Sequence, residues 1–560
     1  MKFFSKEIVS IHAAALLIGA AGFLADILAV FRDRLLAGTF GAGRELDMYY
    51  AAFQIPDFLF TVFLVGAASS AILPIFLQYW EKDEEDAKKM ITALLNVFFL
   101  LSGVFAISAV FLAPLIVRRA FPGFSASEQV TTAMLTRIMM LSPILLSISN
   151  IIASVMQSFR RFFVYVLTSL CYNVGIIFGI LFFVPRFHIV GLALGVILGA
   201  SLHLLIQLPT FFGLGFRPNP FLGFWHPGVA RIMRLSAPRV FTLSINQITG
   251  FAVIAFASLL MPGSIAVFQL ANNLRYIPVG IFAVSYAISV FPKLSQFVVR
   301  NDAKSFSEDF FLTMRNIFFW TMPAAVSFFV LRAHLVRLAF GAGKFNWTDT
   351  RLTAAVLGVF SAAMIFDSLI LLFVRGFYAL GDTRRPFYLS VASGLLVFSS
   401  VVFFITPNFA ARGIIFWFAG VLKISDVPDV RVIGIPFAFA FGSAFDAVML
   451  YMLLKKTAQA RLHDFSSGGA FREMKKIFFA SIASGGVMWL GLRFISLFFR
   501  LDTFVAVLGE ALFSLAVGAA GYVLLLYCFG SEDLIQLFYA LKKTLFGLKK
   551  VVPEEYVAEK

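Results

Sequence analysis

Apolar stretches of about 20 residues recur along the whole chain, separated by short segments rich in charged residues, Gly and Pro. A helix of about 20 residues crosses the roughly 30 Å hydrocarbon layer of a bilayer, so each stretch predicts one membrane-spanning helix. Because lipid offers backbone groups no hydrogen-bond partner, helices are expected rather than open strands. About 14 spans fit the pattern, near 8–31, 46–78, 90–117, 132–157, 162–184, 189–214, 236–260, 264–292, 310–331, 352–377, 387–405, 432–454, 477–499 and 503–529.

The composition indicates an all-α membrane protein and excludes an ordinary soluble globule. Of the 560 residues, 60% are hydrophobic and 14% are charged, against about 45–50% and about 25% in soluble domains. The two cysteines, Cys171 and Cys528, lie inside predicted spans and do not indicate a redox compartment. The first apolar run is too long for the core of a cleavable signal peptide, so it is kept as a span.

A formal net charge of +16 in a soluble protein would suggest a nucleic-acid partner. In a membrane protein, the meaning of this charge depends on which loops carry it. If the N-terminus is cytoplasmic, alternate loops and both ends carry about 28 Lys and Arg, and the opposite side about 14. This asymmetry is the positive-inside pattern of membrane proteins. We therefore expect both termini in the cytoplasm, and no nucleic-acid partner.

Two short correspondences predict an internal duplication. Residues 71–79 read AILPIFLQY, and residues 289–297, 218 positions later, read SVFPKLSQF with Pro and Gln in the same places. Residues 158–163 and 382–387 correspond in the same way at an offset of 224. Two parallel six-span halves with a substrate path between them are typical of transporters. The expected divisions are 1–225 and 226–460 for the halves, 461–530 for two extra spans, and 531–560 for a tail.

The tail has the pattern of an amphipathic helix. After Ser531, which can cap a helix, apolar residues follow helical spacing at Leu534, Leu537, Phe538, Leu541, Leu545 and Leu548. Lysines lie on or near the other face at positions 542, 543, 549 and 550. The pattern favours an interfacial cytoplasmic helix bound to anionic lipid. A solvated basic tail is the alternative.

The chain carries no enzymatic signature that we could identify. Its six histidines are scattered without metal-ligand spacing, and a Walker loop is lacking. The segment 40–43, FGAG, lacks the Lys and Ser or Thr of a phosphate-binding loop and is read as a turn. We therefore expect no catalysis, no metal and no cofactor.

Ionisable residues inside or bordering the predicted spans are the candidates for function. Each costs about 2.5–3.5 kcal/mol at mid-membrane on insertion scales, so most should face a wet cavity or a partner. A cavity lined by Arg32, Arg239 and Arg275 would favour an anionic substrate, because guanidinium binds phosphate through paired donors. For any one residue, a structural ion pair or a snorkelling side chain is the alternative. The set is Asp26, Arg32, Asp47, Arg137, Arg239, Arg275, Asp367, Asp446 and Glu510.

Several motifs resemble one known family. Residues 32–43 read RDRLLAGTFGAG, residues 46–56 read LDMYYAAFQIP, residues 244–247 read SINQ, and residues 376–386 read GFYALGDTRRP. Together these are similar to the MurJ/MviN lipid II flippases, members of the multidrug/oligosaccharidyl-lipid/polysaccharide exporter superfamily. The resemblance covers nearly the whole chain. It implies two six-helix lobes around a central cavity, two extra helices, and a place in the bacterial cytoplasmic membrane.

The resemblance also implies a substrate and an action. In that family, undecaprenyl-diphosphate-linked peptidoglycan precursor moves from the inner to the outer leaflet by alternating access. With no ATP site in this chain, the membrane potential or an ion gradient would supply the energy. The expected partners are that polyprenyl-linked glycan, membrane lipids and a coupling ion.

Carried over by position, Arg32 matches a cavity arginine of the family and Asp47 its acidic residue in the second span. The sequence departs from the family at Asp26, at 60–61 (Phe-Thr) and at Asn273, where arginines are usual. We hypothesise that Arg239 and Arg275 restore positive charge from shifted positions. The candidate substrate-binding residues are Arg32, Asp47, Arg239, Asn273, Arg275, Asp26 and Gln247. The candidate hinges are Gly41, Gly43, Pro56 and Pro278, although packing kinks would equally explain the prolines.

Two other interpretations stay open at this point. The missing arginines favour a flippase for another polyprenyl-linked glycan, or a drug or ion antiporter of the same superfamily. A membrane-embedded enzyme, or a scaffold for one, is the third possibility.

Overall fold

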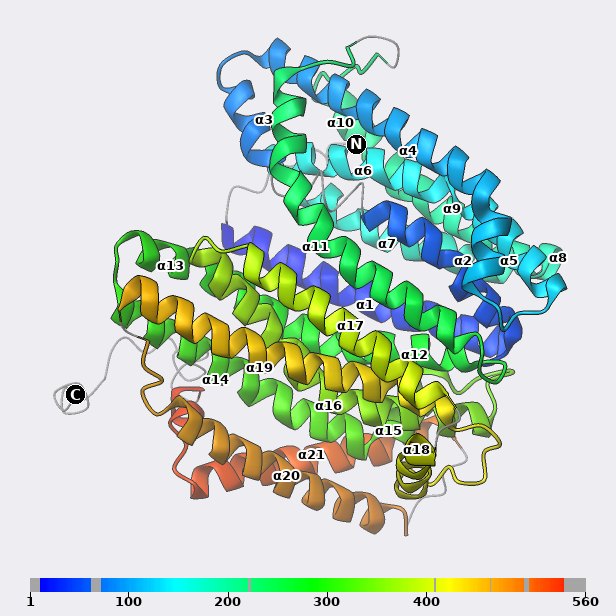
Figure 1. The fold of residues 1–560 in the computed structure, drawn as a ribbon, viewed down its shortest axis with the longest axis vertical. Coiled ribbons are helices and arrows are strands. Elements are labelled where there is room, and N and C mark those ends of the chain that lie inside the picture. Colours follow the sequence, from blue (N-terminus) through cyan, green and yellow to red (C-terminus); the bar gives the residue numbers. More distant parts are fainter. Residues whose placement is uncertain are drawn as a thin grey trace. The chain divides into compact units, whose positions relative to one another are not determined.

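The computed structural model describes residues 11–61, 72–219, 223–406, 409–463, 465–497 and 503–537. Within these ranges every regular element is a helix and no strand occurs, which confirms the predicted all-α class. Figure 1 traces the helices along the chain. Their bounds are α1 (Ile11–Phe40), α2 (Arg44–Phe60), α3 (Ile72–Trp80), α4 (Glu84–Ala120), α5 (Ala126–Met139), α6 (Leu141–Ser158), α7 (Phe162–Phe178), η2 (Gly179–Phe183), α8 (Val184–Phe187), α9 (Val190–Leu205), α10 (Leu208–Gly213), α11 (Pro227–Ala257), α12 (Ser264–Pro278), η3 (Val279–Val284), α13 (Ser285–Val299), α14 (Ala303–Val330), α15 (Arg332–Phe340), α16 (Trp347–Ala379), α17 (Arg384–Ile405), α18 (Phe409–Val421), η4 (Arg431–Ile433), α19 (Gly434–Leu462), α20 (Ala470–Ile495) and α21 (Phe504–Cys528).

Among the described residues, ten helices are long and apolar enough to cross a membrane. The count becomes eleven if α14 and α15, bent by 79° from one another, form one broken span. These elements correspond one to one to eleven of the predicted spans. The other three predictions, at 8–31, 46–78 and 236–260, each include residues or side chains outside the description. The short apolar helix α18 lies in a segment where no span was expected.

The chain packs into two compact units, each built from separate segments. Unit 1 comprises Met1–Leu274, Ala339–Val356 and Ser390–Gly442, and unit 2 comprises Arg275–Leu338, Leu357–Leu389 and Ser443–Lys560. The boundary therefore falls inside α12, α15, α16, α17 and α19 rather than in a linker. The duplication at 1–225 and 226–460 stays a prediction from the sequence.

In unit 1, glycines allow α7 and the following segment η2 to pack against α9 with their backbones in close approach. A Cβ added to Gly175 would lie 2.3 Å from the Cα of Gly199, and one added to Gly179 would lie 2.4 Å from the Cα of Gly195. Such small-residue seams are typical of helix association in membranes, where van der Waals packing replaces the hydrophobic effect. The seam holds α7 firmly against α9, and both helices contribute to the cavity described below.

Aromatic side chains fill the interior of each unit. In unit 1, Phe76 of α3 and Phe216 are buried with their ring centroids 6.2 Å apart. In unit 2, Phe306 and Phe310 of α14 stack at 6.2 Å and belong to a buried cluster with residues of α16 and α19. The high Phe content therefore serves packing as well as hydropathy.

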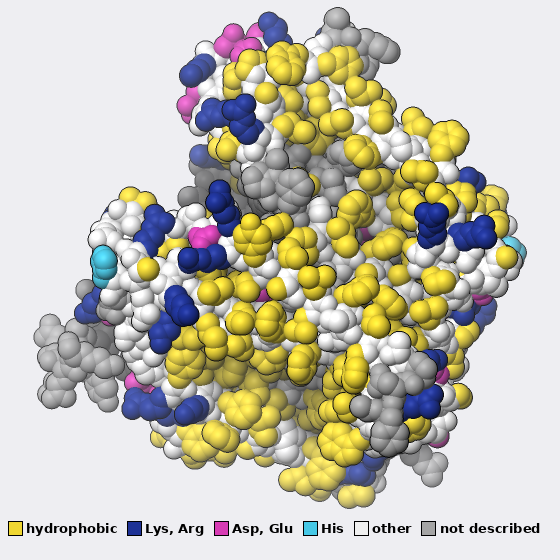
Figure 2. Space-filling view, viewed as in Figure 1, with side chains coloured by type: hydrophobic (Ala, Val, Ile, Leu, Met, Phe, Trp, Pro, Cys, Tyr) yellow, Lys and Arg dark blue, Asp and Glu magenta, His cyan; other side chains and the backbone are white. Residues whose placement is uncertain are grey.

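Apolar side chains also cover much of the outer surface seen in Figure 2. Phe111 of α4 is 76% exposed and Phe416 of α18 is 61% exposed. Exposed apolar area on this scale marks contact with another apolar phase. These faces are the ones we expect to contact lipid acyl chains.

The beginning of the C-terminal tail packs on unit 2. Residues 532–537 are helical, and Leu534 is 2% exposed in a cluster with Phe319 and Ile477. The Arg315 guanidinium of α14 donates through Nε to both carboxylate oxygens of Asp533, at 3.1 and 3.2 Å. Burial raises the pKa of the Asp533 carboxyl, and the Arg315 guanidinium opposes that shift. Leu534 therefore packs against the protein core.

The rest of the predicted interfacial helix lies outside the described residues. This applies to Phe538, Leu541, Leu545 and Leu548 and to the lysines at 542, 543, 549 and 550. The interfacial helix therefore stays a prediction from position 538 onward.

Candidate functional site

Unit 1 contains a cavity of about 390 Å³ lined by residues of α1, α2, α6, α7, α9 and α12. All of its lining residues belong to unit 1. The lining combines charged groups, amides and phenol rings with apolar side chains, among them Leu36, Leu146 and Ile176. A mostly apolar hollow with a few converging polar groups is the usual form of a ligand site.

Arg32 of α1 is held in the cavity by two neighbours. Its Nε and Nη2 donate to Oδ1 of Asp33 at 3.0 and 2.8 Å, and its Nη1 donates to Oδ1 of Asn173 at 3.0 Å. These contacts use three of the five N–H donors of a guanidinium. The side chain remains 20% exposed, whereas that of Asp33 is 4% exposed. Arg32 is thus oriented by its partners and still accessible from the cavity.

Asp33 also binds the predicted residue Asn273. The Asn273 amide donates to Oδ2 of Asp33 at 2.8 Å, and Gln269 donates to the Asn273 carbonyl at 3.3 Å. Both residues come from α12, one helical turn apart. Asp33 therefore joins α1 to α12, and it brings together two of the sequence candidates, Arg32 and Asn273.

Tyrosines form a large part of the cavity wall. Tyr49 and Tyr50 come from α2 and Tyr172 from α7. The rings of Tyr49 and Tyr50 are tilted, with centroids 5.5 Å apart. The Tyr50 hydroxyl is buried without a hydrogen-bond partner among the described residues. Aromatic faces with phenol groups can contact sugar rings and cations, so the wall is suited to an amphipathic or cationic group.

Asp57 is the second carboxylate in the lining. It follows Pro56 on α2 and is half-buried. Within the described part of the chain, its side chain has no hydrogen bond or ion pair. The formally charged residues of the lining are therefore one arginine, Arg32, and two aspartates, Asp33 and Asp57.

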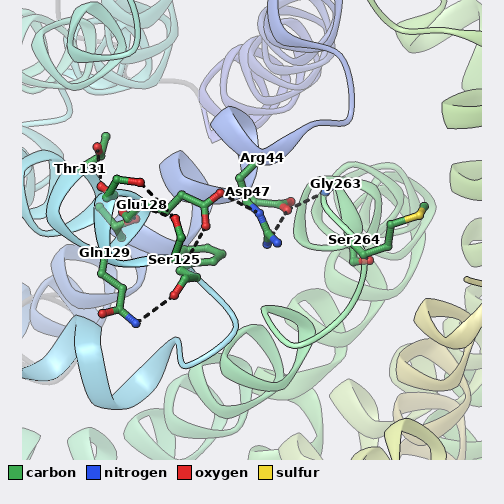
Figure 3. A network of polar contacts seen from close by, with 12 residues as sticks. Arg44, Asp47, Ser125, Glu128, Gln129, Thr131, Gly263 and Ser264 are labelled. Carbon is green, nitrogen blue, oxygen red and sulfur yellow. Dashed lines mark hydrogen bonds and ion pairs between the residues drawn. The ribbon is translucent and has the colours of Figure 1, made fainter.

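Asp47, also in unit 1, is not among the residues that line the cavity. Figure 3 shows it between Arg44 and Gly263. Its Oδ2 accepts the backbone N–H of Gly263 at 2.6 Å, and its Oδ1 accepts that of Ala266 at 2.9 Å. These are amides at the start of α12 with no intrahelical partner, so Asp47 caps that helix from α2. Asp47 is fully buried in this position.

Two further features surround this cap. Arg44 reaches Oδ2 of Asp47 at 3.7 Å and Oε1 of Glu128 at 3.3 Å. Gly263 has a φ of +92°, and a Cβ there would lie 1.9 Å from the carbonyl oxygen of Ala42. The position therefore requires glycine, both for its backbone conformation and for the close approach of the α1–α2 turn.

Arg275 is a buried structural partner in unit 2. It is 2% exposed, and its Nη1 lies 3.1 Å from Oδ2 of Asp367 of α16. The guanidinium carbon lies 4.3 Å from the ring centroid of Phe360. Ser443 of α19 donates to the other Asp367 oxygen at 2.6 Å. Arg275 is not among the residues that line the unit 1 cavity.

The structure leaves two other candidates away from the cavity. Asp26 is exposed on α1, and Gln247 is half-buried on α11. Neither residue belongs to the lining. Arg239 lies within α11, but its side chain is outside the description.

The four candidate hinges take well-defined backbone positions. Gly41 has a φ of +67°, and Gly43 precedes α2 in an extended conformation. Pro56 lies inside α2 and lines the cavity. Pro278 ends α12 directly before the π-helical segment η3. Whether any of them moves stays a prediction.

Sequence reasoning missed several residues that the cavity uses. Asp33, Asp57, Tyr172, Asn173 and His203 line it, and none was a candidate. Two of them carried a signal in the sequence: Asp33 directly follows Arg32, and Asp57 interrupts the apolar run of the second span. Nothing in the sequence marked Tyr172 and Asn173 as functional. Polar residues are common where membrane helices pack together, so their presence in a span does not by itself indicate a binding site.

Comparisons with known proteins agree with this fold. The family model for the lipid II flippase MurJ matches residues 36–510. The lipid II flippase MurJ of Burkholderia cenocepacia is 24% identical over 496 residues, which cover 87% of this chain and 91% of that protein. A solved structure of lipid II flippase MurJ in an inward closed conformation superposes with a TM-score of 0.72 at 24% identity, covering 93% of this chain and 100% of its own. An inward-facing multidrug transporter of the MATE family gives a TM-score of 0.61 at 12% identity, over 79% of this chain and 96% of its own.

Proposed function

From the premise that this chain belongs to the MurJ family of lipid II flippases, we propose that it carries the headgroup of lipid II through the cavity of unit 1. The substrate moves from the inner to the outer leaflet of the bacterial cytoplasmic membrane by alternating access. The chain acts as a transporter and not as an enzyme. The observation that carries the proposal is a cavity in which a few polar groups converge, with Arg32 oriented in it, among helices long enough to span a bilayer.

The cavity lowers the free-energy cost of moving a charged headgroup across the membrane. A diphosphate bearing a sugar-peptide head cannot cross hydrocarbon unaided, because burying isolated charge costs tens of kcal/mol in the Born limit. Hydrogen-bonding groups that line a water-accessible hollow replace the lost hydration. The polyprenyl tail can stay in the lipid throughout. The protein then needs to enclose only part of the headgroup at any one time.

Arg32 is the residue that we assign to the diphosphate. Asp33 and Asn173 hold its guanidinium through three donors, which leaves two N–H groups for phosphate oxygens. Charge-assisted bonds of this kind are short and directional. Asn273, which binds the same Asp33, fixes the carboxylate that orients Arg32.

The membrane potential is the proposed source of energy. Moving one negative charge outward across an inside-negative potential gains about 2.3 kcal/mol per 100 mV. A coupling ion is a further element of the proposal, as is the orientation with both termini in the cytoplasm. The excess of Lys and Arg in alternate loops supports that orientation.

The proposal is tested in a strain depleted of its own lipid II flippase. The wild-type chain should restore growth, and in proteoliposomes it should move lipid II to the opposite leaflet. Arg32→Ala should strongly reduce both activities, whereas Arg351→Ala, which removes a half-buried arginine of unit 1 outside the cavity lining, should preserve them. Growth restored equally by Arg32→Ala would contradict the assigned role of Arg32. Failure of the wild-type chain in both assays would contradict the function itself.

A second function has one observation in its favour. Two aspartates against one arginine in the cavity would suit a cationic drug, as in an exporter of the same superfamily. This alternative predicts no growth rescue but increased resistance to cationic drugs, with resistance lost in Asp57→Asn. Growth rescue with no change in resistance would exclude it.

A further inference from the structure

Asp57 lines the cavity, yet nothing in the proposed transport of lipid II uses it. We propose that the unit 1 cavity recognises a primary ammonium group on the peptide part of the headgroup, with the Asp57 carboxylate as its acceptor. This inference rests on the proposed function and specifies which part of the substrate the cavity recognises. Its support comes from charge balance, from the chemistry of the wall and from the size of the cavity.

The charge balance of the lining leaves one carboxylate over. Arg32 and Asp33 neutralise each other through the ion pair at 2.8 Å. Asp57 forms no ion pair with a described residue, and the cation that acts on it through space, Arg32, is already paired with Asp33. A half-buried carboxylate in this position is stabilised when a cation binds, and it repels an anion. The diphosphate is therefore excluded from the Asp57 part of the cavity and is left to Arg32.

The wall chemistry favours an organic ammonium over a metal ion. A metal ion requires several oxygen or nitrogen ligands in a fixed geometry, and the described residues contain no group of three or more His, Cys, Asp and Glu that could supply them. Tyr49, Tyr50 and Tyr172 instead contribute aromatic side chains to the lining. An ammonium group can bind a carboxylate and an aromatic face together, through an ion pair and a cation–π contact.

The size of the cavity limits what can enter. A volume of about 390 Å³ lies near the lower end of small-molecule pockets. The complete sugar-peptide head is too large for it, but one aminoalkyl side chain with its flanking peptide unit is not. The cavity therefore binds only a portion of the headgroup, and the remainder stays in water.

The experiment compares two substrates that differ only in this charge. Purified full-length protein in proteoliposomes is supplied with lipid II, or with lipid II whose free peptide amine has been N-acetylated. For the wild-type chain we expect translocation of the acetylated lipid to be slower by about tenfold or more, the value of one charge-assisted hydrogen bond. In Asp57→Asn the two lipids should move at equal rates, and in Asp57→Glu the preference should return.

A matched control is Asp426→Asn, which removes an exposed loop carboxylate of unit 1 and should leave the preference intact. Equal rates for the two lipids in the wild-type chain would overturn the inference while leaving the proposed function in place. The inference is also overturned if Asp57→Asn keeps the preference, or if it abolishes only a dependence on Na⁺ or pH, which would assign Asp57 to a small cation. If the wild-type chain moves neither lipid, the proposed function fails and the inference fails with it.

Discussion

Arg32 in unit 1 and Arg275 in unit 2 form a natural pair for comparison. Arg32 directly follows the first predicted span and Arg275 lies in the eighth, so the sequence ranks them alike, and in the structure both contact an aspartate. The Arg32 side chain is 20% exposed to its cavity, and an adjacent aspartate and an amide orient it. The Arg275 side chain is 3% exposed, between Asp367 and the ring of Phe360. An arginine inside a membrane protein can therefore serve either a substrate or the packing, and its surroundings decide which.

The largest effect should come from breaking the buried pair. Arg275→Met leaves the Asp367 carboxylate without its ion-pair partner, which costs about 3–5 kcal/mol in comparable buried pairs. We expect a markedly lower unfolding temperature in detergent and a loss of folded protein in the membrane.

The control for that experiment removes both charges. In Arg275→Met combined with Asp367→Leu, no uncompensated charge remains, so stability should return toward that of the wild type. Were Arg275→Met to unfold at the wild-type temperature while losing transport, Arg275 would belong to the substrate path, and the contrast with Arg32 would disappear.

The next largest effect should come from Arg32, and it should appear in transport rather than in stability. Charge-assisted hydrogen bonds contribute about 1.5–3 kcal/mol each, so Arg32→Ala should slow translocation of lipid II by about 10- to 100-fold. Arg32→Lys keeps the charge but loses the paired donors, and should recover only part of the rate. A fall in unfolding temperature as large as that of Arg275→Met would show that Arg32 is also structural.

Asp47 should give a smaller effect of the structural kind. Replacing it with Ala removes the acceptor for two backbone amides at the start of α12, and loss of such a cap typically costs about 0.5–2 kcal/mol. Asp47→Asn retains an acceptor and should cost less. Thermal unfolding of the two variants in detergent measures the difference. Equal stability of Asp47→Ala and the wild type would mean that water replaces the cap.

The smallest effect should come from an exposed pair in unit 1. Arg351 donates to Asp426 at 2.7 Å, and this hydrogen bond lowers the pKa of the Asp426 carboxyl. A lowered pKa means that the pair stabilises the fold above the usual carboxyl range and is lost as the pH falls through the lowered value. Exposed pairs contribute little, so Asp426→Asn should barely change thermal unfolding at neutral pH. A large loss there would show that the pair is shielded from water.

Local pattern was sufficient to predict most of the fold. The apolar runs 90–117 and 503–529 form the helices α4 and α21 at the expected places, because a helix satisfies its own backbone hydrogen bonds in lipid. The predicted span 310–331 ends at the break between α14 and α15, but the pattern did not show that the chain continues there as a second helix bent by 79°. The short helix α18 was missed for a related reason, since its apolar segment is shorter than a full span.

The site was less accessible to sequence reasoning because its contacts join distant positions. Arg32 meets Asn173 across 141 residues, and Asp47 caps amides of α12 across more than 200 residues. Ion pairs in spans show themselves as single charges in a sequence, and their partners appear only when helices pack. For this reason the sequence suggested Arg275 as a substrate-binding residue, although it forms an ion pair with Asp367. Asp57 was not among the candidates, although it lines the cavity.

The central claim is that the headgroup of lipid II occupies the unit 1 cavity. Its most direct test places a photo-crosslinking phenylalanine analogue at Tyr172, on the cavity wall, and separately at Tyr451. Tyr451 is equally half-buried but packs between Phe373 and Phe471 of unit 2. Our account predicts a light-dependent adduct with lipid II at position 172 and none at position 451. An active protein that forms no adduct at 172, or forms equal amounts at both positions, would contradict it.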